Sequence, residues 1–155
     1  MRTTPSIRPK RPAIRWLLLA TLLAALAGPA IGQQAETFGP YRVHYNALNT
    51  NLLTPEVARA YGIQRAGTRA MLNVTVLDAD AVESVPARVT ATATNLTGQR
   101  RDIEVREIRD QDAIYYIGTF RVHNEETLNF SVQVSPEGHQ GDPFEFDFRQ
   151  QFFVD

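Results

Sequence analysis

Three histidines are the residues of this 155-residue chain best suited to proton transfer near neutral pH or to binding a soft metal ion. They are His44, His123 and His139. None stands at the i, i+4 spacing of a helical metal site, and the chain has no cysteine to complete one. This pattern favours an ordinary role for all three, on the solvated faces and in the turns of the fold.

The least isolated of them is His123, which is followed closely by Glu125 and Glu126. A tight turn here would bring an imidazole beside a carboxylate, the arrangement of an acid–base pair or a small metal site. These three residues support an alternative function as a small metal-binding protein or enzyme. The main prediction is a protein without catalytic residues, metal or cofactor, since the serines also lack a Gly-x-Ser-x-Gly motif.

The first 32 residues have the order of a secretory signal peptide. Five basic residues and no acidic ones precede Trp16, the run from Trp16 to Ala27 is almost wholly apolar, and small residues follow. The apolar run is shorter than the roughly 20 residues that span a bilayer. We expect cleavage after Ala30 or Gly32, which leaves one domain, residues 33–155, in the periplasm or, as a second choice, outside the cell.

The charge of this expected mature chain narrows the choice of partner. It keeps eleven arginines, no lysine and seventeen acidic residues, a formal net charge of −6. A negative chain disfavours nucleic acid and anionic membrane surfaces as partners. The partner we expect is another periplasmic or envelope protein, and the sequence leaves the oligomeric state open.

Seven stretches rich in β-branched and aromatic residues are separated by turn-forming residues, which is the pattern of an all-β protein. The predicted strands are 38–46, 70–77, 85–94, 101–108, 113–122, 127–135 and 144–154. Charges on both faces of 101–108 are typical of a sheet edge. The strands 113–122 and 127–135 flank a short polar break, so we expect them to pair as a central hairpin.

A short helix is predicted between the first two of these strands. Thr54 has the type of an N-cap, Pro55 suits the first helical position, and Gly62 ends the segment. Strands of this length and spacing predict a single antiparallel β-sandwich of the immunoglobulin or fibronectin type III kind.

Aromatic residues of this sandwich are predicted on both sides of the sheets. Phe146 belongs to a row of large rings on one face of 144–154, and we expect these rings to pack against the small residues around Ala91. In the pairs Tyr115–Tyr116 and Phe152–Phe153, neighbouring rings must point to opposite faces. We expect Tyr115 and Phe153 outside the core, as a candidate interface.

Six segments resemble a family of short exported proteins of Gram-negative bacteria that is catalogued only as a domain of unknown function. The segments are 41–47 (YRVHYNA), 53–63 (LTPEVARAYGI), 92–99 (TATNLTGQ), 106–109 (REIR), 113–117 (AIYYI) and 124–128 (NEETL). The resemblance covers essentially the whole expected mature chain. It implies export and a single domain, and it brings no activity, ligand or catalytic residue.

These observations predict an exported, non-enzymatic binding or accessory module that acts through loops or strand edges. Beside the metal-site alternative, a sugar- or lipid-binding sandwich remains open, which would need exposed aromatic residues beside a concave pocket. The fold does not choose among the three, because sandwiches serve all of these functions.

Overall fold

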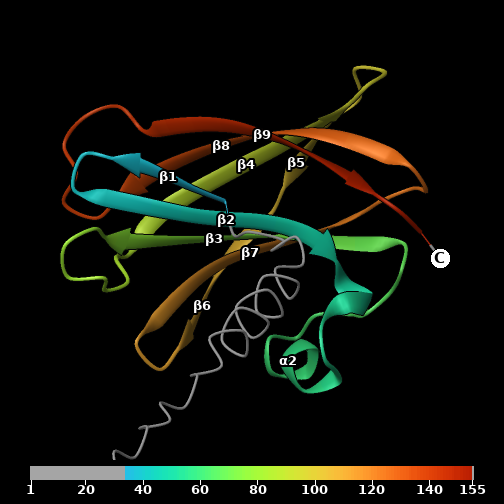
Figure 1. Ribbon diagram of the computed structural model, residues 1–155, viewed down its shortest axis with the longest axis horizontal. Helices are drawn as coiled ribbons and strands as arrows, with labels where there is room; N and C mark the ends of the chain where they lie inside the picture. Colours follow the sequence, from blue (N-terminus) through green and yellow to red (C-terminus); the bar gives the residue numbers. More distant parts are fainter. Residues whose placement is uncertain (1–33, 155) are drawn as a thin grey trace, which may run out of the picture. The chain divides into compact units, whose positions relative to one another are not determined.

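The computed structural model describes residues 34–154, and nine strands in this range form two antiparallel sheets that pack face to face (Figure 1). Sheet A has the order β1-β2-β3-β7-β6, with β1 (Gln34–Phe38), β2 (Tyr41–Asn49), β3 (Arg69–Asp78), β7 (Ala113–Arg121) and β6 (Val105–Asp110). Sheet B has the order β5-β4-β8-β9, with β5 (Arg100–Ile103), β4 (Ala87–Asn95), β8 (Glu126–Pro136) and β9 (Phe144–Phe152). The predicted signal peptide and its cleavage sites lie outside the described residues.

The order of the strands confirms the predicted immunoglobulin-like sandwich. With β2 to β9 taken as successive strands A, B, C, C′, D, E, F and G, sheet A has the order A-B-E-D and sheet B the order C′-C-F-G. The alternation of apolar and polar residues explains the layers, since each strand sends every second side chain inward. Val43, Leu72, Val74, Phe130 and Val132 are among the fully buried inward residues.

Two differences account for nine strands where about seven were expected. β1 precedes the predicted first strand and pairs with β2. The predicted strand 101–108 divides at Glu104 into β5 and β6, which belong to different sheets. Each half is an edge strand, so the edge position predicted from its charges is confirmed.

Gly118 makes this crossing between the sheets possible. It lies on the inner face of β7 and pairs with Val105, directly after the crossing. A Cβ atom at Gly118 would overlap the side chain of Ile103 and would lie 2.9 Å from the carbonyl oxygen of Glu104. The close approach of the chain therefore requires a residue without a side chain at this position.

The predicted central hairpin is wrong. β7 pairs with β3 on one side and β6 on the other, whereas β8 pairs with β4 and β9 in the opposite sheet. Because both edges of β7 are occupied, the chain leaves sheet A after Arg121 and enters sheet B at Glu126. The hairpin of this region joins β6 to β7 through a two-residue turn, in which Gln111 has a φ of 53°.

The helical segment follows the sequence prediction closely. α2 (Pro55–Ala60) is preceded by the 3-10 turn η2 (Thr50–Leu52), and the Thr54 hydroxyl accepts a hydrogen bond from the backbone of Val57. Gly62 has a φ of 62°, and the next residue returns a hydrogen bond to Ala58. α2 comes after the second strand because β1 adds one strand before it. Ala58 packs with Met71 and Ile117, so the segment covers one end of the outer face of sheet A.

The last strand confirms its predicted inward face but not its predicted neighbour. Phe146 is buried, and its ring centroid lies 4.5 Å from that of Tyr45 in sheet A. Ala91 and Phe146 both pair with Val132, from opposite sides of β8. The rings were expected to meet the alanine row either across the sandwich or diagonally within it. The arrangement across the sandwich is wrong, since both rows belong to sheet B and lie on either side of β8.

Candidate functional site

The predicted cluster at His123 is brought together only in part. His123 Nδ1 lies 3.3 Å from Glu126 Oε2, and the backbone N–H of His123 donates to the same oxygen at 3.0 Å. Arg101 donates to the other carboxylate oxygen, Oε1, at 2.5 Å. Glu125 lies in the turn itself, with a φ of 58°, and its backbone carbonyl accepts a hydrogen bond from the Gln151 side chain. The Glu126 side chain is only 9% exposed, so this carboxylate fastens the start of β8 to β5.

The electrostatics of Glu126 fit this structural role. Burial raises the pKa of its carboxyl, but the hydrogen bond from the His123 backbone and the charge of Arg101 outweigh it, and the pKa lies below the ordinary value of 4.5. A depressed carboxyl pKa stabilises the fold above the unfolded-state value, and the stabilisation is lost as the pH falls through the folded-state value.

We expect Glu126→Gln to lower the free energy of unfolding at pH 7 by about 1–3 kcal/mol, because the charged hydrogen bonds are lost while the shape is kept. The difference from wild type should shrink below pH 4.5 and vanish once Glu126 is protonated in the folded state. Urea unfolding of both proteins between pH 7 and pH 3 measures it. If the two free energies of unfolding differ by the same amount at every pH, the ionised Glu126 carboxylate does not stabilise the fold.

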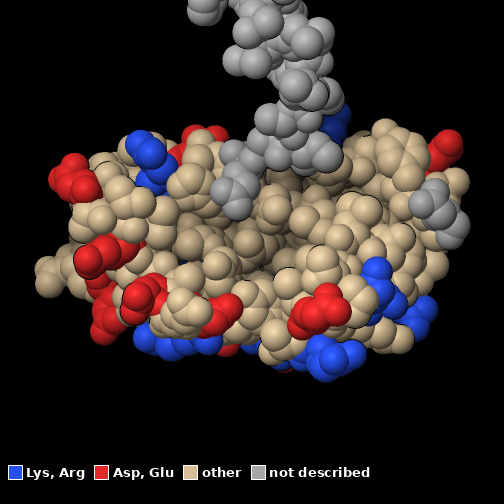
Figure 2. Space-filling model, turned by 60° about the horizontal axis from the view of Figure 1, so that its bottom comes forward, with Lys and Arg blue, Asp and Glu red and all other residues tan. Residues whose placement is uncertain are grey.

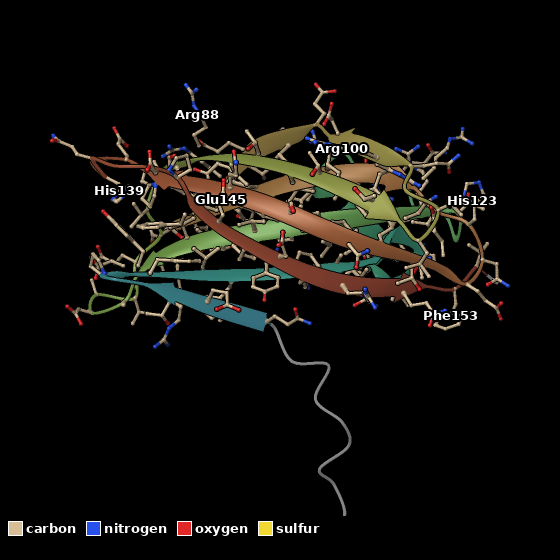
Figure 3. The ribbon with its side chains drawn as sticks, turned by 90° about the horizontal axis from the view of Figure 1, so that it is seen from above. Arg88, Arg100, His123, His139, Glu145 and Phe153 are labelled. Atoms are coloured by element: carbon tan, nitrogen blue, oxygen red, sulfur yellow. The ribbon has the colours of Figure 1, made fainter. Side chains whose placement is uncertain are left out.

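The three histidines do not form a shared centre. Figure 3 shows His123 and His139 at opposite ends of the sandwich. The His139 ring lies 4.4 Å from the ring of Phe144, in the loop before β9. Within residues 34–154, no three His, Cys, Asp or Glu side chains are placed to hold a metal ion.

The two residues of the predicted interface lie on different sheets. Tyr115 is half-buried on the outer face of sheet A, where its ring lies 6.0 Å from that of Tyr61 behind α2. Phe153 follows the end of β9 and is 58% exposed. Asn49 and Asn124 bind the backbone around it, at Phe153 O and Val154 N. Both rings lie outside the central core, as predicted, but they do not form one surface.

The outer face of sheet A is hollowed beside Tyr115. A hollow of about 410 Å³ lies over β2 and β3, and a larger one of about 1100 Å³ extends toward the β6–β7 turn. The two share the lining residues Thr75, Leu77, Val82 and Tyr115. Figure 2 shows a hollowed, uncharged area in the middle of one face of the molecule, with charged side chains at its left and below it.

Polar side chains on β2 and β3 form the floor of the smaller hollow. The register places His44 opposite Thr75 and Asn46 opposite Asn73, so the four side chains make one patch. His44 Nδ1, Asn46 Oδ1 and Asn73 Oδ1 are buried and have no hydrogen-bond partner. They are three of the five such atoms among the described residues. A buried polar atom without a hydrogen-bond partner lowers the stability of the fold by about 1–3 kcal/mol. The presence of three such atoms in one hollow therefore needs an explanation.

The outer face of sheet B provides the contrast. Its polar side chains pair with one another across the strands: Asn129 accepts from Arg149 at 2.7 Å, and Gln133 donates to Glu145 at 2.5 Å. Thr90 donates to Gln133 at 3.4 Å. Cross-strand pairing therefore satisfies polar groups on sheet B but leaves them unsatisfied in the hollow of sheet A.

A rigid loop forms one rim of the hollow. The carboxylate of Asp78 accepts hydrogen bonds from the backbone of Asp80 and Ala81, each at 2.9 Å, and the bonds from Ala81 and Asp80 hold the pKa of Asp78 below its usual value. Val82 has a φ of 58°, which is uncommon for a β-branched residue, and is 69% exposed. Its N–H donates to Asp78 O at 2.9 Å. The loop thus holds an apolar side chain at the edge of both hollows.

The segment that follows α2 packs beside Tyr115, which borders the hollow. The Tyr61 hydroxyl donates to Asp110 at 3.0 Å, and burial together with this bond raises the pKa of Tyr61. Arg106 donates to the carbonyls of Tyr61 and Gly62, which end the helix. These bonds hold the segment against β6, where the Tyr61 ring lies near that of Tyr115, and Tyr115 also borders the hollow.

The sequence identified Tyr115 but missed the amides beside it. His44, Asn46 and Asn73 alternate with buried residues, which predicts a solvated face. The alternation does not show that some of their polar atoms are buried, nor that Val82 and Tyr115 line the same hollow. The signal that was present is the pair of asparagines in facing strands, since asparagine is uncommon in strand interiors.

Comparisons with known proteins agree with this architecture. A family model described as a domain of unknown function (DUF4426) matches residues 35–155. The crystal structure of a DUF4426 family protein (PA0388) from Pseudomonas aeruginosa PAO1 is 34% identical, with a TM-score of 0.70. The match covers 80% of this chain and 97% of that one.

More distant structures share the fold alone. A copper-bound variant of FetP from uropathogenic Escherichia coli strain F11 is 12% identical with a TM-score of 0.58, covering 78% of this chain and 95% of that one. FetP as isolated after expression in the periplasm of E. coli is also 12% identical, with a TM-score of 0.57 and coverages of 78% and 93%. No curated protein matches the sequence. In the described part of the chain, no helix has the length and apolarity to cross a membrane.

Proposed function

Because this chain belongs to the DUF4426 family, whose description assigns no activity, we propose a function from its own surface: it is an exported, non-enzymatic binding module that holds a small ligand in the hollow on the outer face of sheet A. The observation that carries the proposal is the group of buried, unpaired atoms on His44, Asn46 and Asn73. Because solvent does not reach these atoms in the free protein, a ligand hydrogen-bonds to them once the side chains turn toward the hollow, and it then removes their desolvation cost.

The rest of the hollow supports binding rather than catalysis. Its described lining holds amide, hydroxyl and aromatic groups, which orient a ligand, and His44 stands there without a carboxylate beside it to form an acid–base pair. A volume of about 410 Å³ falls within the range of small-molecule sites. Export to the periplasm is proposed from the leader at residues 1–32. Loops and strand edges, expected from the sequence as contact surfaces, carry less support than this hollow.

Native mass spectrometry of the protein isolated gently from a periplasmic extract tests the proposal. The wild-type protein should carry a bound small molecule, and Asn73→Leu should not, because leucine keeps the shape of the side chain but offers no hydrogen bond. Asn129→Leu on the outer face of sheet B is the matched control and should keep the molecule. An identical adduct on all three proteins, or none on wild type, would count against the hollow as the site.

Stability gives a second, ligand-free test. Asn73→Leu should raise the stability of the free protein by about 1 kcal/mol, or roughly 2–8 °C in melting temperature, because it removes an unpaired buried amide. Asn129→Leu should lower it, since Asn129 accepts a hydrogen bond from Arg149. Stabilisation by removing a polar group is the behaviour of a binding site rather than of a structural residue. If Asn73→Leu melts below wild type, Asn73 has a structural role and the proposal loses its main support.

A further inference from the structure

We infer that the ligand of this hollow is a saccharide, an uncharged or singly acidic sugar that lies over β2 and β3 with one face against Tyr115. The inference rests on the proposed function and names the chemical class of its ligand. Three properties of the hollow lead to it: its charge, its hydrogen-bonding groups and its aromatic side.

The charge of the smaller hollow's own lining disfavours cationic ligands. In the described lining of the smaller hollow, Arg42 is the one residue with a permanent charge, and it is exposed at the rim. A free metal ion or an ammonium group would find no carboxylate there to balance it. A neutral ligand fits the floor, and an acidic substituent would lie toward Arg42.

The hydrogen-bonding groups match hydroxyls. Asn46 and Asn73 each offer an amide that both donates and accepts, and the Thr75 hydroxyl does the same. A sugar hydroxyl also donates and accepts, so it can satisfy either end of each amide. His44 Nδ1 adds a ring nitrogen that pairs with a hydroxyl in either tautomer. Facing residues on an antiparallel pair have Cβ atoms about 4.5–5.5 Å apart, so one small ring can reach several of these groups at once.

The aromatic side suits the other surface of a sugar ring. A pyranose has faces made of C–H groups, and these faces are removed from water when they lie against an aromatic ring. Tyr115 borders the hollow, and Leu77 and Val82 extend its apolar edge. The amide and hydroxyl groups beside this aromatic ring favour a sugar over a lipid, because the acyl chains of a lipid offer no hydrogen bonds.

The experiment is an amide NMR titration of the processed, ¹⁵N-labelled protein with glucose, N-acetylglucosamine, galactose and glucuronate, and with Zn²⁺ as a non-saccharide probe. At least one sugar should shift the amides of His44, Asn73 and Tyr115. Asn73→Leu should weaken that binding by about tenfold, the effect of one lost hydrogen bond. Tyr115→Leu should weaken it similarly while Tyr115→Phe keeps it, because the ring face remains. Asn129→Leu should bind as wild type does.

The outcomes separate this inference from the proposed function. If no sugar shifts these amides while Asn73→Leu still raises the melting temperature, the saccharide assignment is overturned and the binding site stands. If Zn²⁺ alone shifts them, the saccharide assignment is replaced by a metal site. If no sugar binds and Asn73→Leu melts below wild type, both proposals fall. A sugar that shifts only amides of sheet B also overturns the inference, since the site would lie elsewhere.

Discussion

Phe130→Ala should lower the free energy of unfolding by about 3–5 kcal/mol, because the cavity left by a fully buried ring closes only in part. Phe130 is 1% exposed in the centre of β8. Its ring stacks on Phe148 with centroids 4.6 Å apart and reaches Phe120 of the opposite sheet at 5.6 Å. A single side chain thus packs both within its own sheet and across the sandwich.

Urea denaturation followed by far-ultraviolet circular dichroism checks this prediction. A domain of this size has a total stability of about 5–15 kcal/mol, so Phe130→Ala should unfold at a much lower urea concentration. Phe153→Ala is the matched control, since it removes the same ring from a position that is 58% exposed. It should change stability by less than about 1 kcal/mol. Equal losses in the two variants would mean that the ring of Phe130 is not central to the packing.

Gly118→Ala should destabilise the fold by about 1–3 kcal/mol, although alanine is otherwise the smallest available change. The added methyl group would meet Ile103 and the backbone of Glu104, where the chain crosses between the sheets. Either β6 moves away from β7 or the crossing opens, and both outcomes lose backbone pairing.

A double-mutant cycle identifies the cause of this loss. Ile103→Ala removes the side chain that the new methyl group overlaps, so Gly118→Ala should cost less in that background than in wild type. The remaining cost reports the contact with the Glu104 carbonyl. Strictly additive effects of the two substitutions would show that the close approach does not limit residue 118.

The sequence predicted correctly which side chains of a strand face the core, but it predicted poorly which strands pair. Alternation of apolar and polar residues identifies the inward side chains, so the inward rows containing Val132 and Phe146 were correct. The same alternation does not identify the sheet to which a strand belongs. The pair 113–122 and 127–135 was therefore assigned to one hairpin, whereas the pairing of β7 with β3 and β6 sends β8 into the other sheet.

The same limit applies to the candidate site. Tyr115 was expected outside the core because two adjacent tyrosines cannot both point inward, and the structure places it there. The alternation of polar and apolar residues around Asn73 is that of a solvated face. The Oδ1 atom of Asn73 is buried in a hollow that Val82 and Tyr115 also line, and strand alternation contains no information about such neighbours.

The crossing at Glu104 also bears on how the sandwich moves. On that side a single residue links the two sheets, so they cannot separate there without unfolding a strand. On the opposite side, packed aromatic rings join them: Phe38 stacks on Phe144 with centroids 4.9 Å apart, and Tyr45 lies tilted against Phe148 at 4.8 Å. Rings in contact slide and separate more readily than a covalent chain. The two sheets should therefore separate first at the edge formed by β1 and β9 and last at Glu104. In a native-state hydrogen-exchange experiment, amides of β1 and β9 should exchange before those near Glu104.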